Sequence, residues 1–300
     1  MNGGRGRLAL VDDMGAQDEP QAISPRIYNQ RLRLRAPLGE AAEYALGSLI
    51  THRWQIIQTF RRDFTGLSDL TRWGAFWNYA LPIVPLGVYV LLMALRLFPS
   101  FGEVSGVVYI TMGVTLWFLF SGLLRSPVAA IERDFKSLAR TDTPIFVAIA
   151  TSVSTLFFET MVRAIVVIAV FIAFQGAPSW KIVYAPAFLV FGALLFASIG
   201  VILALFNLAY RDIAKILGVT LAYGIFFSGV IFPLQGGAVM DAILRANPFF
   251  VFIENIRSAC VGGGIVYPSS LATFCALSVA LSAIAVIFAY RSEFRLRGLV

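Results

Sequence analysis

Six long runs of apolar residues dominate this sequence and limit what it can fold into. Each run approaches or exceeds the roughly 20 residues that a helix needs to cross a bilayer's hydrocarbon layer. The chain is 58% hydrophobic and 14% charged, whereas soluble domains are about half apolar and a quarter charged. We therefore expect an all-α integral membrane protein. Its six transmembrane helices are predicted at residues 75–98, 106–124, 145–173, 183–206, 213–232 and 270–290.

The region before the first span divides into two parts. Residues 1–40 are polar, rich in Arg and interrupted by Gly and Pro, which predicts a disordered cytoplasmic tail. Residues 41–72 contain an amphipathic segment, 44–64, which we interpret as a helix in the cytoplasmic membrane surface. The alternative is a helix packed on a soluble domain. The apolar side of this segment holds Leu46, Leu49, Ile50, Ile57, Phe60 and Phe64.

Lys and Arg in the short connections predict the orientation of the spans. With a cytoplasmic N-terminus, the inner connections and the C-terminal tail carry most of the basic residues. The outer connections hold only Lys181, Arg245 and Arg257. We therefore expect both termini in the cytoplasm. This asymmetry also explains the net charge of +7 without nucleic-acid binding.

Two connections are longer than turns. We predict a cytoplasmic loop at 125–144, with a short charged surface helix over Glu132–Arg140. The second connection, 233–268, is predicted to be external and is divided by Asn247–Pro248 into two short helical pieces. Neither piece is long enough to span a bilayer, so we expect a re-entrant-like amphipathic hairpin at the outer face. Its polar side would carry Glu254 and Arg257.

A polar stripe lies inside the third predicted span. Glu159 and Arg163 are four residues apart and therefore neighbours on one helix face, which Ser152 and Thr155 share. A charge at mid-bilayer costs about 3 kcal/mol or more, so this face should meet protein or a water-filled path. The stripe either fixes helix packing in a bundle or dimer, or forms the wall of a conduit.

No catalytic or metal-binding motif accompanies the spans. The sequence has no Gly-x-x-x-x-Gly-Lys-Ser/Thr phosphate loop, no His-Glu-x-x-His and no Gly-x-Ser-x-Gly. We expect a protein that is not an enzyme and binds no metal or cofactor. If it moves a substrate uphill, another chain supplies the energy.

The many aromatic residues allow two interpretations. Interfacial belts and packing explain most of them, but aromatic faces also stack on sugar rings. The candidates for such a substrate path are Tyr89, Trp117, Tyr223, Phe226 and Phe227.

Several local stretches, in this order, resemble the membrane subunits of type-2 ABC exporters, particularly the capsular polysaccharide and O-antigen export permeases. These are "FRRDFTGLSDLTRWGAFWNYALP", "FFETMVRAIVVIAVFI", "YRDIAKILGVTLAYGIFFSGVIFPL", "NPFFVFIENIRSACVGG" and "FAYRSEFR". The resemblance covers most of residues 55 to 295. It implies a six-span domain over 73–300 in the bacterial inner membrane.

The resemblance also implies the partners. Such a subunit forms a homodimer and pairs with two ATP-binding cassette subunits, which hold ATP and Mg. The substrate would be a lipid-linked capsular polysaccharide, with membrane lipids around it and periplasmic co-polymerase or export proteins beyond. The hairpin would form an external gate with Asn247, Pro248, Glu254 and Arg257. The ATPase interface would include Arg61, Arg62, Glu132, Arg133, Lys136 and Arg140.

Two other functions fit the same sequence. One is a permease of this type that exports O-antigen, a teichoic-acid-like polymer, a lipid or a drug. The other is a membrane assembly protein that transports nothing. A partner ATPase and glycan-synthesis genes nearby would distinguish the three.

Overall fold

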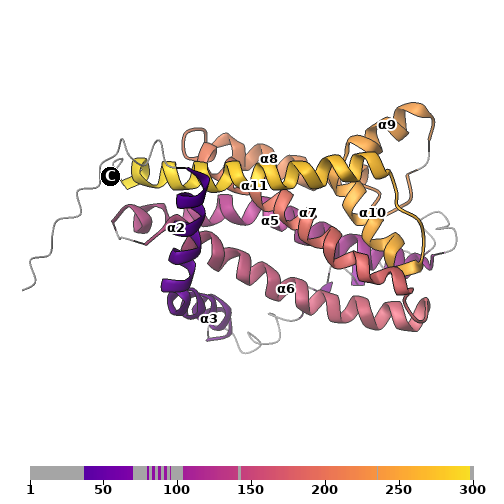
Figure 1. Cartoon of the computed structure of the whole chain (residues 1–300). Coiled ribbons are helices and arrows are strands. Elements are labelled where there is room, and N and C mark those ends of the chain that lie inside the picture. Colours follow the sequence, from indigo (N-terminus) through magenta and orange to yellow (C-terminus); the bar gives the residue numbers. More distant parts are fainter. Residues whose placement is uncertain are drawn as a thin grey trace, which may run out of the picture. The chain divides into compact units, whose positions relative to one another are not determined.

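The computed structural model describes residues 37–69, 104–140, 143–234 and 236–297, with scattered positions between 80 and 95. Within these ranges every regular element is a helix (Figure 1). The predicted tail 1–36 and most of the predicted first span, 75–98, lie outside the described residues. The elements are α2 (Leu38–Thr51), α3 (Arg53–Asp69), α5 (Gly106–Arg140), α6 (Ile145–Phe174), η1 (Trp180–Tyr184), α7 (Ala185–Asn207), α8 (Asp212–Gly224), η2 (Ile225–Phe227), α9 (Ala238–Ala246), α10 (Pro248–Val261) and α11 (Pro268–Arg297).

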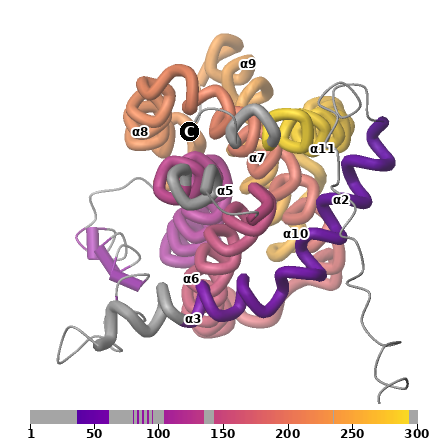
Figure 2. The backbone as a smooth tube through the Cα atoms, turned by 90° about the vertical axis from the view of Figure 1, so that its left-hand side faces the viewer, coloured from indigo at the N-terminus to yellow at the C-terminus, as the bar shows by residue number. Residues whose placement is uncertain are grey.

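Four of the described helices are long and apolar enough to cross a membrane. Within the part of the chain that the structure describes, these stretches are Gly106–Asp134, Ile145–Phe174, Trp180–Asn207 and Pro268–Glu293. They correspond to four of the six predicted spans. Helix α5 packs against α6 and α7, and α11 packs against α7 (Figure 2). The described helices thus form a multi-pass membrane bundle.

Helix α5 is much longer than the predicted second span. It continues without a break from Gly106 to Arg140, through Pro127. The prediction of a loop at 125–144 with a separate surface helix was therefore wrong. A proline inside a helix removes one N–H donor and so leaves the carbonyl four residues earlier, that of Leu123, without its helical partner. Helix α7 comes close at this point, where Gly200 allows the approach.

The fifth predicted span, 213–232, is not one helix. Helix α8 has only 13 residues and is followed by the short turn η2. The chain then turns at Ser228 and Gly229, where Gly229 has φ of +58°. Irregular backbone at membrane depth is tolerated only where protein satisfies it. Here Asn247 donates to the carbonyl of Phe227 (3.0 Å), and Tyr109 donates to that of Gly229 (2.8 Å).

The predicted interfacial helix is two helices. Helix α2 ends at Thr51 and α3 begins at Arg53, because His52 leaves the helical conformation with φ −97° and ψ +16°. Helix α2 buries its small side chains, Ala41, Ala45 and Ser48, against the bundle. Leu46 and Ile50 stay exposed, as a helix lying in a membrane surface requires.

Helices α9 and α10 lie at the end of the bundle opposite α2 and α3 (Figure 1). They meet at Asn247–Pro248, and α10 ends at Gly262, which has φ of +89°. Helix α9 is largely exposed, but nearly every residue of α10 from Phe250 to Cys260 is buried. The polar side predicted for this part of the hairpin therefore lies within the bundle, with Arg257 buried and Glu254 partly buried.

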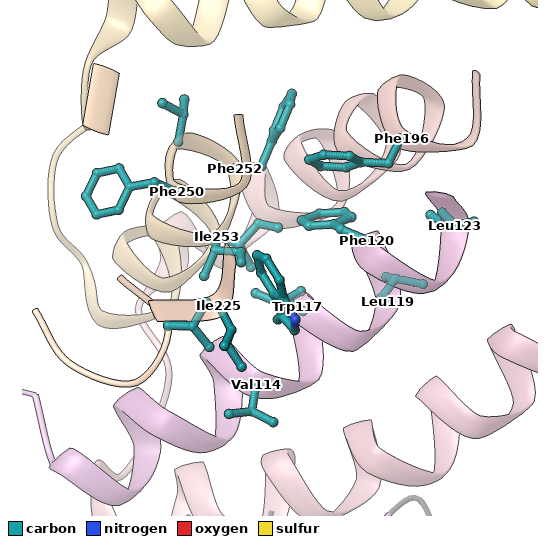
Figure 3. Close-up of a cluster of buried hydrophobic side chains, with 14 of the residues drawn as sticks. Val114, Trp117, Leu119, Phe120, Leu123, Phe196, Ile225, Phe250, Phe252 and Ile253 are labelled. Atoms are coloured by element: carbon teal, nitrogen blue, oxygen red, sulfur yellow. The ribbon is translucent and has the colours of Figure 1, made fainter. Parts of the chain in front are cut away.

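The main core surrounds α10. Phe252 and Phe196 both lie next to Phe120, with ring centroids 6.2 and 4.9 Å from that of Phe120 (Figure 3). Ile253 points toward Trp117 in the same cluster (Figure 3). Helix α10 is enclosed because its aromatic side chains fill the space between α5 and α7, where burying each one contributes about 2 kcal/mol.

Candidate functional site: a polar groove between α5 and α6

A groove of about 540 Å³ runs between α5 and α6. All four residues of the predicted polar stripe line it. The α5 side adds two arginines and two serines that sequence reasoning did not connect with the stripe. The lining residues are Phe118, Ser121, Gly122, Arg125, Ser126, Ala129, Arg133, Ser152, Thr155, Leu156, Glu159 and Arg163.

Arg163 and Glu159 form one end of this polar groove, called the deep end because it lies near the middle of α6. An Arg163 guanidinium nitrogen lies 3.1 Å from a Glu159 carboxylate oxygen. The Arg163 guanidinium also lies 4.9 Å from the centroid of the Phe118 ring on α5, a cation–π distance. The Arg163 side chain is 8% exposed and that of Glu159 is 43% exposed. The ion pair and the ring hold the arginine against α5, while the carboxylate stays open to the groove.

Arg125, Ser126 and Ser152 form the other end of the groove, called the shallow end. The hydroxyl of Ser152 donates to the backbone carbonyl of Ser126, 3.2 Å away, which ties α6 to α5. Arg125 is exposed in the groove. Eight residues further along, Arg133 forms an ion pair with Asp134 (3.0 Å). Because positions eight apart lie on one helix side, both arginines face the groove.

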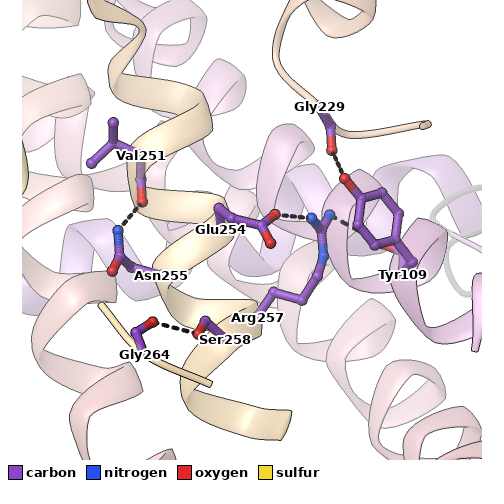
Figure 4. Close-up of polar contacts among 8 residues, drawn as sticks. All are labelled: Tyr109, Gly229, Val251, Glu254, Asn255, Arg257, Ser258 and Gly264. Carbon is purple, nitrogen blue, oxygen red and sulfur yellow. Dashed lines mark hydrogen bonds and ion pairs between the residues drawn. The ribbon is translucent and has the colours of Figure 1, made fainter. Parts of the chain in front are cut away.

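A second polar cluster lies behind α10. Arg257 is 1% exposed, forms an ion pair with Glu254 and donates to the backbone carbonyl of Tyr109 at 3.2 Å (Figure 4). Its guanidinium lies 3.5 Å from the centroid of the Tyr109 ring. The same tyrosine donates its hydroxyl to Gly229 (Figure 4). This cluster joins α10, α5 and the turn after α8. Arg257, predicted on the polar side of the hairpin, therefore connects these elements inside the bundle.

The other predicted gate residues shape the start of α10. Asn247 caps the helix by accepting from the backbone N–H groups of Phe249 and Phe250. Pro248 occupies the first helical position, where its missing N–H costs nothing. The side-chain amide of Asn247 also donates to Ser228. One side chain thus fixes the helix start and the turn after η2 together.

The five candidate aromatics do not form one surface. Tyr89 lies outside the described residues. Trp117 is buried and packs against Phe249 with ring centroids 4.4 Å apart, away from the exposed aromatic residues of α8 and η2. A Cβ added to Gly224 would lie 3.1 Å from the Trp117 ring, which shows how closely α8 covers it. The remaining three are exposed on α8 and η2: Tyr223, Phe226 and Phe227.

The predicted ATPase-interface residues occur at two places. Arg61 is exposed on α3, and Glu132 and Arg133 are exposed on the last third of α5. The helices also include Arg62, Lys136 and Arg140, whose side chains lie outside the described residues. Arg133 belongs to the polar groove as well as to this set. The sequence signal that was missed is the spacing of Arg125 and Arg133, which becomes visible once α5 is read as one helix.

Taken together, the spanning helices and the irregular but satisfied backbone after α8 define a multi-pass membrane protein. A family model described as "ABC-2 type transporter" matches residues 55–261. This range is more than half of the chain and includes the polar groove and the Arg257 cluster. The chain belongs to the ABC-2 type transporter family.

A curated relative agrees with this assignment. Over 99 residues the chain is 29% identical to Nodulation protein J of Azorhizobium caulinodans. The aligned stretch covers 32% of this chain and 39% of that protein, which is less than two thirds of the relative's length. The family model covers more of the chain than this alignment does, and the assignment to the ABC-2 type transporter family rests on it. Subunits of this family work with ATP-binding cassette subunits.

Proposed function

We propose that this chain is the permease subunit of an exporter that moves a lipid-linked capsular polysaccharide across the bacterial inner membrane. Hydrolysis of ATP, with Mg, takes place on a separate ATP-binding subunit. Two copies of the chain form the membrane part of the exporter. Periplasmic co-polymerase or export proteins receive the polymer.

The observation that carries this proposal is the polar groove in an ABC-2 family chain. Polar and charged side chains inside a bilayer are costly unless they face other protein groups or a water-filled path. The groove extends along α6 from Ser152 to Arg163, about 16 Å at 1.5 Å per residue. This is about half the hydrocarbon thickness of a bilayer. A conduit for a polar polymer with a lipid end needs such a surface.

The grouping of elements at the two ends of the bundle supports the proposal that both termini of the chain are cytoplasmic. Helix α2 and the last part of α11 lie together, since Tyr290 bonds to Glu40. The start of α6 joins them through the ring contact of Tyr44 with Phe146. The predicted outer segments meet at the other end, where Lys181 donates to the carbonyl of Gly262 (2.9 Å). In the proposed orientation, the first group of segments faces the ATPase.

The experiment is deletion of the gene in its native host. If the proposal is right, cells without the chain keep synthesising polymer but accumulate it inside, and the wild-type chain restores surface polymer. Surface polymer at the normal level in the deletion strain would overturn the proposal. Accumulation of O-antigen, a teichoic-acid-like polymer or a lipid instead would assign the corresponding alternative. If the deletion cells retain none of these compounds, the result would favour a membrane assembly protein that transports nothing.

The Glu159–Arg163 pair provides a sharper test within the chain. We expect Glu159→Ala or Arg163→Ala to reduce export or dimer assembly, because each removes half of the ion pair that closes the groove's deep end. Thr273→Ala is a matched control, since Thr273 is exposed and bonds only to its own helix among described residues. Normal export and assembly in both groove variants would show that the pair has no such role.

Docking of the ATP-binding subunit is tested separately. We expect charge reversal at Arg133 or Arg140 to weaken co-purification of that subunit, because both lie on the cytoplasmic extension of α5 in the proposed orientation. Charge reversal at Arg245, on α9 at the opposite end, is the control. Undiminished co-purification in both α5 variants would place the docking surface elsewhere.

A further inference from the structure

Among the residues that the structure describes, the shallow end of the polar groove holds a positive charge without an ion-pair partner. Arg163 pairs with Glu159, and Arg133 pairs with Asp134. Arg125 is exposed in the groove, and no ion-pair partner is found for it among the described residues. A guanidinium presents a planar set of donors that matches a phosphate through two parallel hydrogen bonds. The groove therefore offers a site for one anionic group beside Arg125.

A hydroxyl next to Arg125 supports the same conclusion. The Ser126 hydroxyl belongs to the groove wall, is buried, and has no hydrogen-bond partner in the described part of the chain. A buried hydroxyl without a partner is costly. Its neighbour across the groove, the Ser152 hydroxyl, is already used in the bond to the Ser126 carbonyl. An acceptor oxygen beside Arg125 would satisfy the Ser126 hydroxyl.

The surroundings favour a lipid as the source of this acceptor. Arg125 directly follows the apolar run 106–124, where a lipid headgroup meets the edge of the hydrocarbon layer. The groove wall beyond it holds Phe118 and Leu156. The opposite face of helix α6 exposes large apolar side chains, as expected for a helix in contact with hydrocarbon, so lipid borders the helix that forms one groove wall. These side chains are Phe157, Met161, Ile165, Ile168 and Ile172.

The carboxylate of Glu159 limits how far an anion can move inward. It is partly exposed in the groove and lies at the middle of α6, which runs from Ile145 to Phe174. An anion that approached Glu159 would be repelled, although Arg163 offsets part of that charge. The favourable position is therefore near Arg125.

We infer that the shallow end of the polar groove, formed by Arg125 and Ser126, binds the phosphate of an anionic lipid headgroup. In the exporter proposed above, on which this inference rests, that lipid is the anchor of the substrate. Arg125 supplies the charge and Ser126 a donor, while Glu159 stops the phosphate from moving deeper. The polymer end then lies toward the cytoplasmic extension of α5.

Photo-crosslinking tests this site directly. The full-length chain, with its ATP-binding subunit where the two co-purify, is placed in phosphatidylcholine nanodiscs containing a photoactivatable phosphatidic acid. Labelled peptides are mapped by mass spectrometry. We expect labelling of the groove segments of α5 and α6. Arg125→Gln should lower it about fivefold or more, because a charge-assisted bidentate contact is lost, and Arg125→Lys should keep part of it.

Two further variants make the test specific. Arg211→Gln is the matched control, since Arg211 is exposed between α7 and α8 and outside the groove; it should leave labelling unchanged. Glu159→Gln should not lower labelling, because the repelling charge is removed. Equal labelling in wild type and Arg125→Gln would overturn the inference. So would complete competition by millimolar inorganic phosphate, which would identify a site for a free anion.

Export and co-purification separate the remaining outcomes. If Arg125→Gln releases the ATP-binding subunit while lipid labelling is unchanged, the groove is a protein-docking surface and the inference is wrong. If deletion cells accumulate polymer but Arg125→Gln exports it normally, the inference also fails while the proposed function stands. If labelling depends on Arg125 but deletion cells accumulate no polymer, the proposed function fails and the lipid-phosphate site remains.

Discussion

Tyr290 donates a hydrogen bond to Glu40 at 2.8 Å, although 250 residues separate them in the sequence. A second bond runs the opposite way between the same helices, from Tyr44 to Glu293 at 3.1 Å. The two tyrosine rings meet edge to face, with centroids 5.1 Å apart. This crossed pair attaches α2 to the end of α11 and fixes where the amphipathic helix lies.

Removal of one of these hydroxyls should loosen α2. We expect Tyr290→Phe to speed hydrogen exchange of the α2 amides about fivefold, because a lost hydrogen bond costs about 1 kcal/mol. The ring contact remains in this variant. Tyr210→Phe is the control, since Tyr210 is exposed. Exchange in α2 that is as slow as in the wild type would show that the Tyr290–Glu40 bond does not hold the helix.

Replacement of Gly200 should disturb the contact of α7 with α5. A Cβ at this position would overlap the carbonyl oxygen of Leu123 and would lie 2.9 Å from that of Leu124. Both are backbone atoms, so the helices must separate. We expect Gly200→Ala to destabilise the protein by about 1–3 kcal/mol, measured by thermal unfolding in detergent. Gly218→Ala, where the added Cβ meets open space, should be neutral or stabilising; equal behaviour of the two variants would contradict the prediction.

Loss of Arg257 should be severe. Its guanidinium bridges Glu254 and the carbonyl of Tyr109 in a buried position. Arg257→Ala leaves Glu254 without this partner and opens a cavity, so we expect a cost of about 3–5 kcal/mol. Arg245→Ala, at an exposed ion pair, should cost about 1 kcal/mol or less. The measurements are the amount of folded chain in the membrane and the unfolding temperature; similar values for both variants would refute the role of Arg257.

The attachment of α9 should depend on pH in two directions. The Tyr267 hydroxyl, which donates to Asp241, holds the pKa of that carboxyl below its usual value, and Arg245 adds to this effect. The same bond raises the pKa of Tyr267. A lowered acid pKa gives stability that is lost as the pH falls through the folded value, and a raised tyrosine pKa gives stability that is lost as the pH rises through it. Attachment is therefore strongest between about pH 4 and pH 10.

Hydrogen exchange of the α9 amides between about pH 3 and pH 11, corrected for intrinsic rates, measures this dependence. Protection should fall at both extremes. Tyr267→Phe should remove the alkaline limb and reduce the acid limb, because Arg245 still pairs with Asp241, whereas the amides of α7 provide an internal control. A profile for α9 that is flat in the wild type would contradict the role of the Asp241–Tyr267 bond.

The sequence predicted the helical class, four long spans and the grouping of Ser152, Thr155, Glu159 and Arg163, because each depends on local pattern. The helix face is set by spacing of three and four residues, and the span by length of an apolar run. The division at Asn247–Pro248 followed from the same kind of signal, since Pro begins helices and Asn caps them.

Tertiary contacts decided what the sequence could not show. The second span was predicted to end at residue 124, but α5 continues through Pro127, because its packing against α6 and α7 outweighs one missing hydrogen bond. Arg257 was placed on the polar side of the predicted hairpin from helical spacing alone. Arg257 contacts Tyr109 on α5, which is 148 positions away in the sequence. No local pattern reveals such a contact. The Arg125 end of the groove was missed for the same reason.

The unbroken course of α5 has a mechanical consequence. At 1.5 Å per residue its 35 residues extend about 52 Å, well beyond the roughly 30 Å of a bilayer's hydrocarbon. The segment near Arg133 and the segment that holds Tyr109 therefore belong to one continuous helix, in which Pro127 is the one break in the hydrogen-bond ladder that its sequence dictates. Because Arg257 is bonded to the carbonyl of Tyr109, a tilt of α5 as a whole would also displace α10.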